Sequence, residues 1–154
     1  MGVTTCTDEI QAAYRSNDLM KTFFHGHSFT ANPMTCAAAN ASLDLLLTEK
    51  CESDRKRLNE RHTSFMEQIS GHDMVRNPRV IGTILAFELN TERDTSYFNE
   101  ARHHLYPYFI EKGLLLRPLG NVIYLIPPYT ISNEDLDYIY TTILDFLNEY
   151  SSLF

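Results

Sequence analysis

The sequence is short of several features on which whole classes of protein depend. Its 154 residues carry 13 Lys and Arg against 20 Asp and Glu, a formal net charge of −7, so a nucleic-acid-binding surface is not expected. The basic residues are scattered apart from a run over 54–57, which is interpreted as a solvated helix face. No apolar run is long enough to span a bilayer. The three cysteines, Cys6, Cys36 and Cys51, lack metal-ligand spacing, which favours reduced thiols in a cytoplasmic protein.

Several catalytic motifs are also missing. There is no glycine-rich phosphate loop, no Gly-x-Ser-x-Gly elbow, no Cys-x-x-Cys pair and no His-Glu-x-x-His helix. Glu88 lies in an apolar segment without a second carboxylate placed to form an acid–base pair. What remains is a chain of about one domain in length, whose 44% hydrophobic content is enough to build a core.

Helical patterns dominate the first half of the chain. One helix is expected to begin at about Thr7 and end near Arg15, and another to begin after Asn32, with Pro33 at its first position. This second helix carries apolar residues at three- and four-residue spacing, which predicts a buried face. The stripe consists of Cys36, Ala39, Leu43 and Leu47. A third helix is expected over 52–70.

Strand-like segments come only in the second half. The almost continuously apolar stretch over 79–89 predicts one strand that is covered on both faces. Residues 114–126 are predicted to form a β-hairpin around a turn at 118–121. Late strands with an antiparallel pair among helices predict an α+β fold, in which helices cover a small antiparallel sheet.

Two further helices are expected in this half. One opens at Asp94, turns Phe98 and Phe109 inward, and is kinked or split by Pro107. The other begins at Ser132. Its predicted buried side consists of Leu136, Ile139, Ile143, Phe146 and Tyr150.

A turn-like segment concentrates polar groups without an obvious structural need. His25, Gly26, His27 and Ser28 stand shortly before the helix that Asn32 caps. A hydroxyl and free backbone N–H groups near a helix N-terminus are suited to holding an anion such as phosphate. The alternative is a turn whose hydroxyls bond to its own backbone. A metal site is disfavoured, because no third ligand accompanies the two histidines at a recognisable spacing.

Arg117 is the second candidate. It follows the apolar residues 114–116, so its guanidinium either reaches solvent or faces a specific anion, and its planar fork of donors suits a carboxylate. Tyr124 could reach the same place, although a tyrosine in a strand usually serves packing. His103 and His104 are interpreted as helix surface.

Two blocks of the sequence resemble a known family. HGHSFTANPMTCAAANASLDLL (25–46) and RPLGNVIYLIPPY (117–129) are similar, in order and spacing, to blocks of the class III, pyridoxal-phosphate-dependent aminotransferases. The first block is shared broadly by class III enzymes that act on ω-amino groups. The second resembles a narrower group in biotin biosynthesis, which converts 8-amino-7-oxononanoate to 7,8-diaminononanoate with S-adenosylmethionine as amino donor. The resemblance covers essentially the whole chain, but only the C-terminal part of this fold-type I transferase family's polypeptide.

The resemblance implies roles for particular residues. His27 and Ser28 stand where the family reaches across a homodimer interface to the phosphate of the other subunit's pyridoxal 5'-phosphate, and the alanine-rich helix anchors that turn. Gly26 stands where the backbone lies against the substrate, and Arg117 where an arginine pairs with the substrate carboxylate. Ala31 replaces a common glycine, so its backbone is expected to be free of any demand for positive φ.

The resemblance also implies that part of the machinery lies elsewhere. The family's Schiff-base lysine precedes the part that matches 2–5, so this chain is expected to lack a catalytic residue, to begin inside the fold at Met1, and to be inactive by itself without binding the cofactor. The chain's own lysines are predicted to lie on helices or their edges in polar surroundings. They are Lys21, Lys50, Lys56 and Lys112.

The implied organisation has three parts. A residual large-domain segment with the phosphate turn covers 1–32, interface helices cover 33–70, and a small α+β domain covers 71–154. The expected partners are small-molecule substrates and a second copy of the protein, with no nucleic acid, membrane or metal. Two alternatives stay open: another class III ω-aminotransferase of the ornithine or aminobutyrate type, or a non-catalytic dimerisation or binding module.

Overall fold

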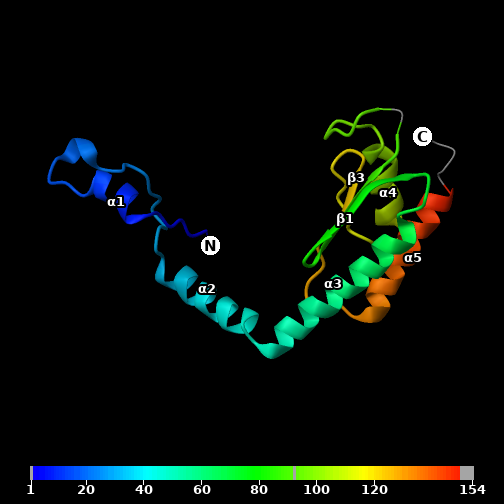
Figure 1. The fold of residues 1–154 in the computed structure, drawn as a ribbon, viewed down its shortest axis with the longest axis horizontal. Helices are drawn as coiled ribbons and strands as arrows, with labels where there is room; N and C mark the ends of the chain where they lie inside the picture. The colour runs from blue at the N-terminus through cyan, green and yellow to red at the C-terminus, as the bar shows by residue number, and fades with distance from the viewer. Residues whose placement is uncertain (1, 92, 150–154) are drawn as a thin grey trace. The chain divides into compact units, whose positions relative to one another are not determined.

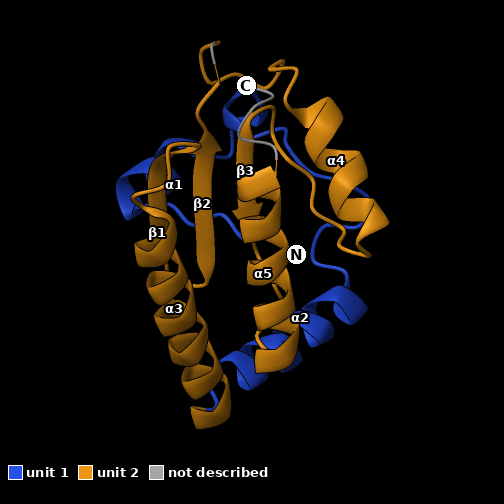
Figure 2. Cartoon of the chain, turned by 90° about the vertical axis from the view of Figure 1, so that its right-hand side faces the viewer, with its two compact units in different colours: residues 1–48 blue, residues 49–154 orange. Residues whose placement is uncertain are grey.

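A computed structural model describes residues 2–91 and 93–149 of the chain, which divides into two compact units. Unit 1 comprises residues 1–48 and unit 2 comprises residues 49–154 (Figure 2). The three-part division expected from the resemblance stays a prediction. In the described ranges, no helix combines the length and the hydrophobicity that crossing a membrane requires.

Unit 1 is helical. It contains α1 (Asp8–Tyr14), the 3-10 helix η1 (Leu19–Lys21) and α2 (Pro33–Leu46) (Figure 1). The Thr7 hydroxyl accepts from the Ile10 amide in the first turn of α1 at 3.4 Å. The Asn32 side chain accepts the Thr35 amide of α2 at 3.2 Å. The predicted starts of both helices are therefore confirmed, and each has the local physical cause that the sequence indicated.

The predicted buried face of α2 is not observed. Cys36 and Ala39 are half-buried, but Leu43 is 50% exposed and Leu47 is 74% exposed. None of the described residues of unit 1 is buried. The three- and four-residue spacing did identify the helix, but no described part of unit 1 covers its apolar stripe.

Unit 2 is an α+β layer. Its elements are α3 (Glu49–Ile69), β1 (Val75–Ile81), β2 (Ile84–Leu89), α4 (Arg102–Glu111), β3 (Val122–Leu125) and α5 (Asn133–Glu149). The strands form one antiparallel sheet in the order β1-β2-β3. Helices α3 and α5 cross the same face of that sheet, and α4 packs beside them (Figure 2). The predicted α+β class with a small helix-covered sheet is confirmed.

The apolar stretch over 79–89 is not one strand covered on both faces. It is interrupted by a turn at Gly82, whose φ of 55° an L-residue rarely adopts, and it forms parts of both β1 and β2. In β2 the side chains of Leu85, Phe87 and Leu89 are buried, whereas the alternating residues are only half-buried. The period-2 pattern is that of a sheet with a single helix-covered face.

The predicted hairpin over 114–126 is also wrong. β3 pairs with β2, placing Leu125 opposite Leu85, while residues 114–118 form no strand. The Leu114 and Leu116 amides donate locally, to the carbonyls of Phe109 and Leu114, and Pro118 has no amide to donate. Only an isolated bridge, from Leu119 to Val122, remains of the expected pairing.

The fourth helix is shorter than predicted. α4 begins at Arg102 rather than Asp94, and Phe98 is 80% exposed because it lies in the turns before the helix. Phe109 is buried as predicted. The helix runs through Pro107 without being split, since the ring removes one hydrogen bond but the remaining turns continue.

The last helix buries most of its predicted side. Leu136, Ile143 and Phe146 are fully buried and Ile139 is half-buried, whereas Tyr150 lies outside the described residues. The helix begins with a cap in which the Ser132 hydroxyl accepts the Asp135 amide at 3.0 Å and donates to its carboxylate at 2.8 Å.

A buried polar pair joins α3 to α5. His62 is fully buried, and its Nδ1 lies 2.7 Å from the Tyr140 hydroxyl. Phe65 stacks on the Tyr140 ring with centroids 4.3 Å apart. Burial lowers the pKa of His62, which a backbone interaction with Thr83 partly opposes, and burial raises the pKa of Tyr140 to about 12. Both side chains are therefore neutral in the folded protein near neutral pH.

The interpretation of the 54–57 run as a solvated helix face is wrong for Arg57. Its guanidinium donates to Asn133 Oδ1 at 2.7 Å and to the carbonyl oxygens of Tyr129 and Ile131 at 3.2 and 2.7 Å. The arginine therefore satisfies the loop that leads into α5. Its partners are more than 70 positions away in the sequence, so no local pattern indicates them.

The turn before β3 depends on a close backbone approach. Gly120 has a φ of +63°, and a Cβ built there would lie 1.7 Å from the Ser96 carbonyl oxygen. The neighbouring Asn121 is buried, and its Nδ2 donates to the Leu89 carbonyl at 2.9 Å and to Thr95 Oγ1 at 3.2 Å. This asparagine ties the turn to both β2 and the loop before α4.

Edge strand β1 contains a bulge. The register shifts between Arg76 and Arg79, Asn77 has a φ of 48°, and Pro78 follows it. The Glu88 carboxylate of β2 accepts from Asn77 at 3.0 Å and from Arg79 at 3.2 Å. It also accepts from the Thr95 hydroxyl at 2.8 Å. Burial raises the Glu88 pKa, but these hydrogen bonds and the Arg79 charge outweigh it and lower the pKa below its ordinary value. Glu88 is thus a structural carboxylate.

Candidate functional site

The turn before α2 is closed by two reciprocal hydrogen bonds. The Thr30 amide donates to the His27 carbonyl at 2.9 Å, and the His27 amide donates to Thr30 Oγ1 at 2.9 Å. A hydroxyl therefore does bond to the turn's own backbone, as one sequence interpretation proposed. That hydroxyl belongs to Thr30, which the sequence reasoning did not single out.

Ser28 is left with its donors available. Neither its hydroxyl nor its backbone amide forms a hydrogen bond with a residue that the structure describes, and the same holds for the Phe29 amide. Two adjacent amides and a hydroxyl, one turn before a helix, form a donor set that suits an anion. The structure thus keeps the anion-binding hypothesis open for Ser28, while the His27 amide is already used.

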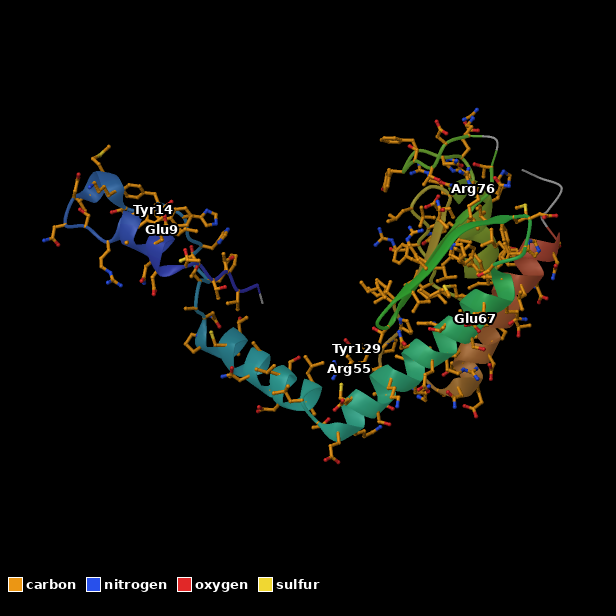
Figure 3. All side chains as sticks on the ribbon, viewed as in Figure 1. Glu9, Tyr14, Arg55, Glu67, Arg76 and Tyr129 are labelled. Carbon is orange, nitrogen blue, oxygen red and sulfur yellow. The ribbon has the colours of Figure 1, made fainter. Side chains whose placement is uncertain are left out.

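A row of rings in contact with one another leads into this turn. Tyr14 of α1, labelled in Figure 3, contacts Phe23, and the contacts continue through His25 and His27 to Phe29. The ring centroids are 5.4, 5.6, 5.4 and 4.9 Å apart in that order. The sequence signal for this row is the alternation of aromatic residues at 23, 25, 27 and 29, which is typical of an extended segment.

The prediction for Ala31 is wrong. Ala31 has a φ of 55°, a left-handed conformation that costs an L-residue about 1–2 kcal/mol. A glycine at this position would adopt it without that cost. At Gly26, in contrast, an alanine would fit without strain, because a Cβ there would meet only Thr30 Oγ1 at 4.0 Å. Nothing among the described residues around position 26 therefore requires a glycine.

The same turn lines a cavity of about 540 Å³ within unit 1. His27, Thr30 and Thr35 contribute to its wall, together with Val3 and Cys36. The lining mixes apolar groups with two hydroxyls, which suits a ligand that has both an apolar body and a polar end.

No lysine is buried in either unit. All four are exposed, and Lys50 and Lys56 pair with Asp54 and Glu60 at 2.9 and 4.0 Å. Among the described residues, no three His, Cys, Asp or Glu side chains are grouped so that they could hold a metal ion.

Arg117 belongs to unit 2, whereas the candidate turn belongs to unit 1. It is exposed and forms no hydrogen bond or ion pair with the described residues. It lines an open depression of about 370 Å³ with Pro118 and with Arg102, His103 and Tyr106 of α4. His103 and His104 do lie on the exposed surface of α4, as predicted. Tyr124, the other tyrosine considered, is not part of this lining.

The chain is similar to known proteins along nearly its whole length. A family model described as aminotransferase class III matches residues 1–147. A Synechococcus elongatus protein named adenosylmethionine-8-amino-7-oxononanoate aminotransferase is 41% identical over 149 residues, which are 97% of this chain and 34% of that protein. An Arabidopsis thaliana protein, named bifunctional dethiobiotin synthetase/7,8-diamino-pelargonic acid aminotransferase, is 34% identical over 82% of this chain and 16% of that protein.

The fold agrees with these relatives. The crystal structure of the Methanocaldococcus jannaschii adenosylmethionine-8-amino-7-oxononanoate aminotransferase matches with a TM-score of 0.77 and 26% identity, over 93% of this chain and 34% of that one. The chain spans about a third of the length of the first relatives it matches.

Proposed function

The chain belongs to the class III aminotransferase family, and on that premise we propose that it supplies cofactor and substrate contacts to a cytoplasmic transaminase of biotin biosynthesis. The proposed reaction converts 8-amino-7-oxononanoate to 7,8-diaminononanoate, with S-adenosylmethionine as amino donor. The observation that carries the proposal is the 41% identity, along 97% of the chain, to a relative named for this reaction.

Pyridoxal 5'-phosphate is the cofactor of the proposed enzyme, and when bound it provides the electron sink on which amino-group exchange depends. The turn fits its phosphate, because the Ser28 hydroxyl and the Ser28 and Phe29 amides are donors without partners among the described residues. In this proposal His27 and Ser28 hold the phosphate of the other subunit's cofactor in a homodimer. Gly26 leaves the adjacent space open for substrate, which its freedom from internal contacts supports.

Arg117 is proposed to bind and orient the substrate. Both 8-amino-7-oxononanoate and S-adenosylmethionine carry a carboxylate, and the planar guanidinium can bind the carboxylate of either one in turn. Its exposure supports this role, and so does its lack of a partner, since no carboxylate of the described residues occupies its donors.

The chain by itself is proposed to be inactive. The cofactor also needs a lysine placed against it, and the four lysines here are exposed rather than enclosed. Treatment of the purified chain with pyridoxal phosphate and borohydride is expected to add no more mass than in a lysine-matched control protein. A stoichiometric adduct on one lysine would show that the chain builds a cofactor site alone, contrary to the proposal.

A chimera tests the full reaction. The C-terminal third of the Synechococcus relative is replaced by this chain, and transamination is measured with S-adenosylmethionine, ornithine and 4-aminobutyrate as donors. We expect activity with S-adenosylmethionine that Arg117→Ala abolishes. Activity with another donor alone would favour a different class III ω-aminotransferase. A folded, dimeric chimera with no activity on any donor would favour a non-catalytic module.

A further inference from the structure

The depression around Arg117 brings several basic groups together. Two arginines, Arg102 and Arg117, contribute to its wall with His103, and the Tyr106 phenol offers a further hydrogen-bond donor. Its lining residues include neither an aspartate nor a glutamate. The depression therefore carries a net positive charge that its own lining does not neutralise.

The arginines of this chain are otherwise mostly engaged. Side-chain hydrogen bonds or ion pairs to described residues occupy Arg15, Arg55, Arg57, Arg61, Arg79 and Arg93. Three form none with the described residues, namely Arg76, Arg102 and Arg117. Two of these three line the same depression. Two unpaired guanidinium groups that line one depression repel each other, and an anion bound in the depression would relieve this repulsion.

No carboxylate among the described residues pairs with Arg102. The carboxylate nearest to it in sequence, Glu100, pairs instead with Arg93 at 3.0 Å. The Arg102 guanidinium lies over the Tyr97 ring, 5.9 Å from its centroid. This contact with an aromatic face restricts the guanidinium without satisfying its N–H donors.

We propose that Arg102 is a second carboxylate-binding residue beside Arg117 and a determinant of substrate affinity in this site. His103 and Tyr106 border the same ligand position. The ligand class is a carboxylate at the end of an aliphatic chain, because a guanidinium fork matches a planar carboxylate and the rim at Pro118 is apolar. This inference rests on the proposed function for the role of Arg117, but the binding itself does not require catalysis.

The test is a binding titration of the whole chain, followed by NMR signals of arginine Nε–H groups and the histidine rings. The probe is 8-aminooctanoate, and 1,8-diaminooctane is the matched ligand in which an amine replaces the carboxylate. Ionic strength is held constant, because surface charge effects are screened by salt. We expect 8-aminooctanoate to shift the His103, Arg102 and Arg117 signals, and 1,8-diaminooctane to leave them unchanged.

Variants assign the binding to residues. We expect Arg102→Gln to weaken binding about threefold to fivefold and Arg117→Gln about tenfold or more. Arg102→Lys keeps the charge but loses the planar fork of donors, so its affinity should lie between those of wild type and Arg102→Gln. The matched control is Arg76→Gln, an exposed arginine on β1 (Figure 3) without a partner among the described residues. It should bind as wild type does.

Three outcomes would overturn the inference. The first is the absence of saturable shifts. The second is an equal loss of affinity for 8-aminooctanoate in Arg76→Gln and Arg102→Gln. The third is a loss of affinity in Arg117→Gln while the affinity of Arg102→Gln stays that of wild type. The last would leave Arg117 its role and remove only Arg102. Failure of the chimera to use S-adenosylmethionine would contradict the proposed function, but not carboxylate binding measured in this chain, so the two failures are distinguishable. Circular dichroism of each variant verifies that the fold is retained.

Discussion

Unit 1 and unit 2 differ in where they keep their apolar groups. Unit 2 buries a continuous core of side chains from α3, the sheet, α4 and α5. The described part of unit 1 buries none, although it contains Phe23, Phe24 and Phe29 and an alanine-rich helix. Both contain apolar residues and helices with side-chain caps, namely α1 and α2 in unit 1 and α5 in unit 2. Capping and periodicity therefore decide where a helix forms. Whether its apolar face is buried depends on another element or chain that packs against it.

The contrast has a functional meaning in the proposed enzyme. A surface that exposes several aromatic and aliphatic side chains is typical of a region that another polypeptide covers. In the proposal, that surface includes the turn which contacts the cofactor of a second subunit. Unit 2 has its own core, to which helix α4 beside the depression contributes Leu105, Tyr108 and Phe109.

Truncating one phenylalanine in each unit should give the largest difference. Phe87 is fully buried in β2, whereas Phe29 is 70% exposed. We expect Phe87→Ala to lower the free energy of unfolding by about 3–5 kcal/mol through lost burial and a residual cavity. Phe29→Ala should change it by less than about 0.5 kcal/mol. Urea unfolding followed by circular dichroism measures both, and equal losses would refute the distinction between the units.

Adding one methyl group should also separate the units. Gly120→Ala brings a Cβ onto the Ser96 carbonyl, and we expect a loss of at least about 3 kcal/mol in the free energy of unfolding. Gly26→Ala in unit 1 meets no close atom and should leave it unchanged. Gly113→Ala, with a φ of +76° and open space, measures the backbone strain alone, about 1 kcal/mol. If Gly113→Ala and Gly120→Ala lowered the free energy of unfolding equally, the close approach of Gly120 to the Ser96 carbonyl would not contribute to the loss.

Acid should weaken unit 2 through His62. Because burial lowers the folded-state pKa of His62, the unfolded chain binds its proton first as pH falls. The stability from the neutral imidazole is present above the ordinary histidine pKa of 6.5, and declines below it by up to about 1.4 kcal/mol per pH unit.

Unfolding free energies measured from pH 7.5 to pH 5 check this expectation. His62→Gln should flatten the profile, whatever it does to stability at pH 7.5. The exposed His25 of unit 1 provides the control, and His25→Gln should keep the wild-type slope. A slope that both variants retain would assign the acid sensitivity to other groups.

The smallest effect is expected in unit 1. Ala31→Gly relieves a left-handed alanine, and we expect it to stabilise the turn by about 1 kcal/mol. Amide hydrogen exchange of Thr30, whose amide bonds to the His27 carbonyl, should slow about fivefold. Ala39→Gly inside α2 is the opposite control, because glycine weakens a helix interior by about 1 kcal/mol. Faster exchange of Thr30 in Ala31→Gly would contradict the prediction.

Local chemistry was predictable from the sequence. Asn32 and Pro33 identified the start of α2, and the Ser132–Asp135 pair identified the start of α5, because a cap bonds within one turn. The α+β class followed in the same way from helix and strand patterns. The candidate turn was located only in part, because the turn residues are 28–31 rather than 25–28, and its closing hydroxyl belongs to Thr30.

Non-local choices were not predictable. The stretch 114–116 is as apolar as a strand, but β3 took β2 as its partner, and nothing within the segment encodes that competition. Arg57 looked like a surface cation because the carbonyls it bonds to lie in a distant loop. No sequence pattern indicated a role for Arg102, because it lines the same depression as Arg117 only when α4 and the segment before β3 come together.

The bulge on β1 has a consequence for how copies of this chain can associate. An edge strand normally offers a template on which another strand can add, which is the first step toward fibrils. Here Asn77 breaks the regular spacing and Pro78 lacks an amide hydrogen, so this edge cannot continue as a ladder. Strand addition at the β1 edge is therefore disfavoured, and contacts that another copy makes at this edge are expected to come from side chains rather than backbone.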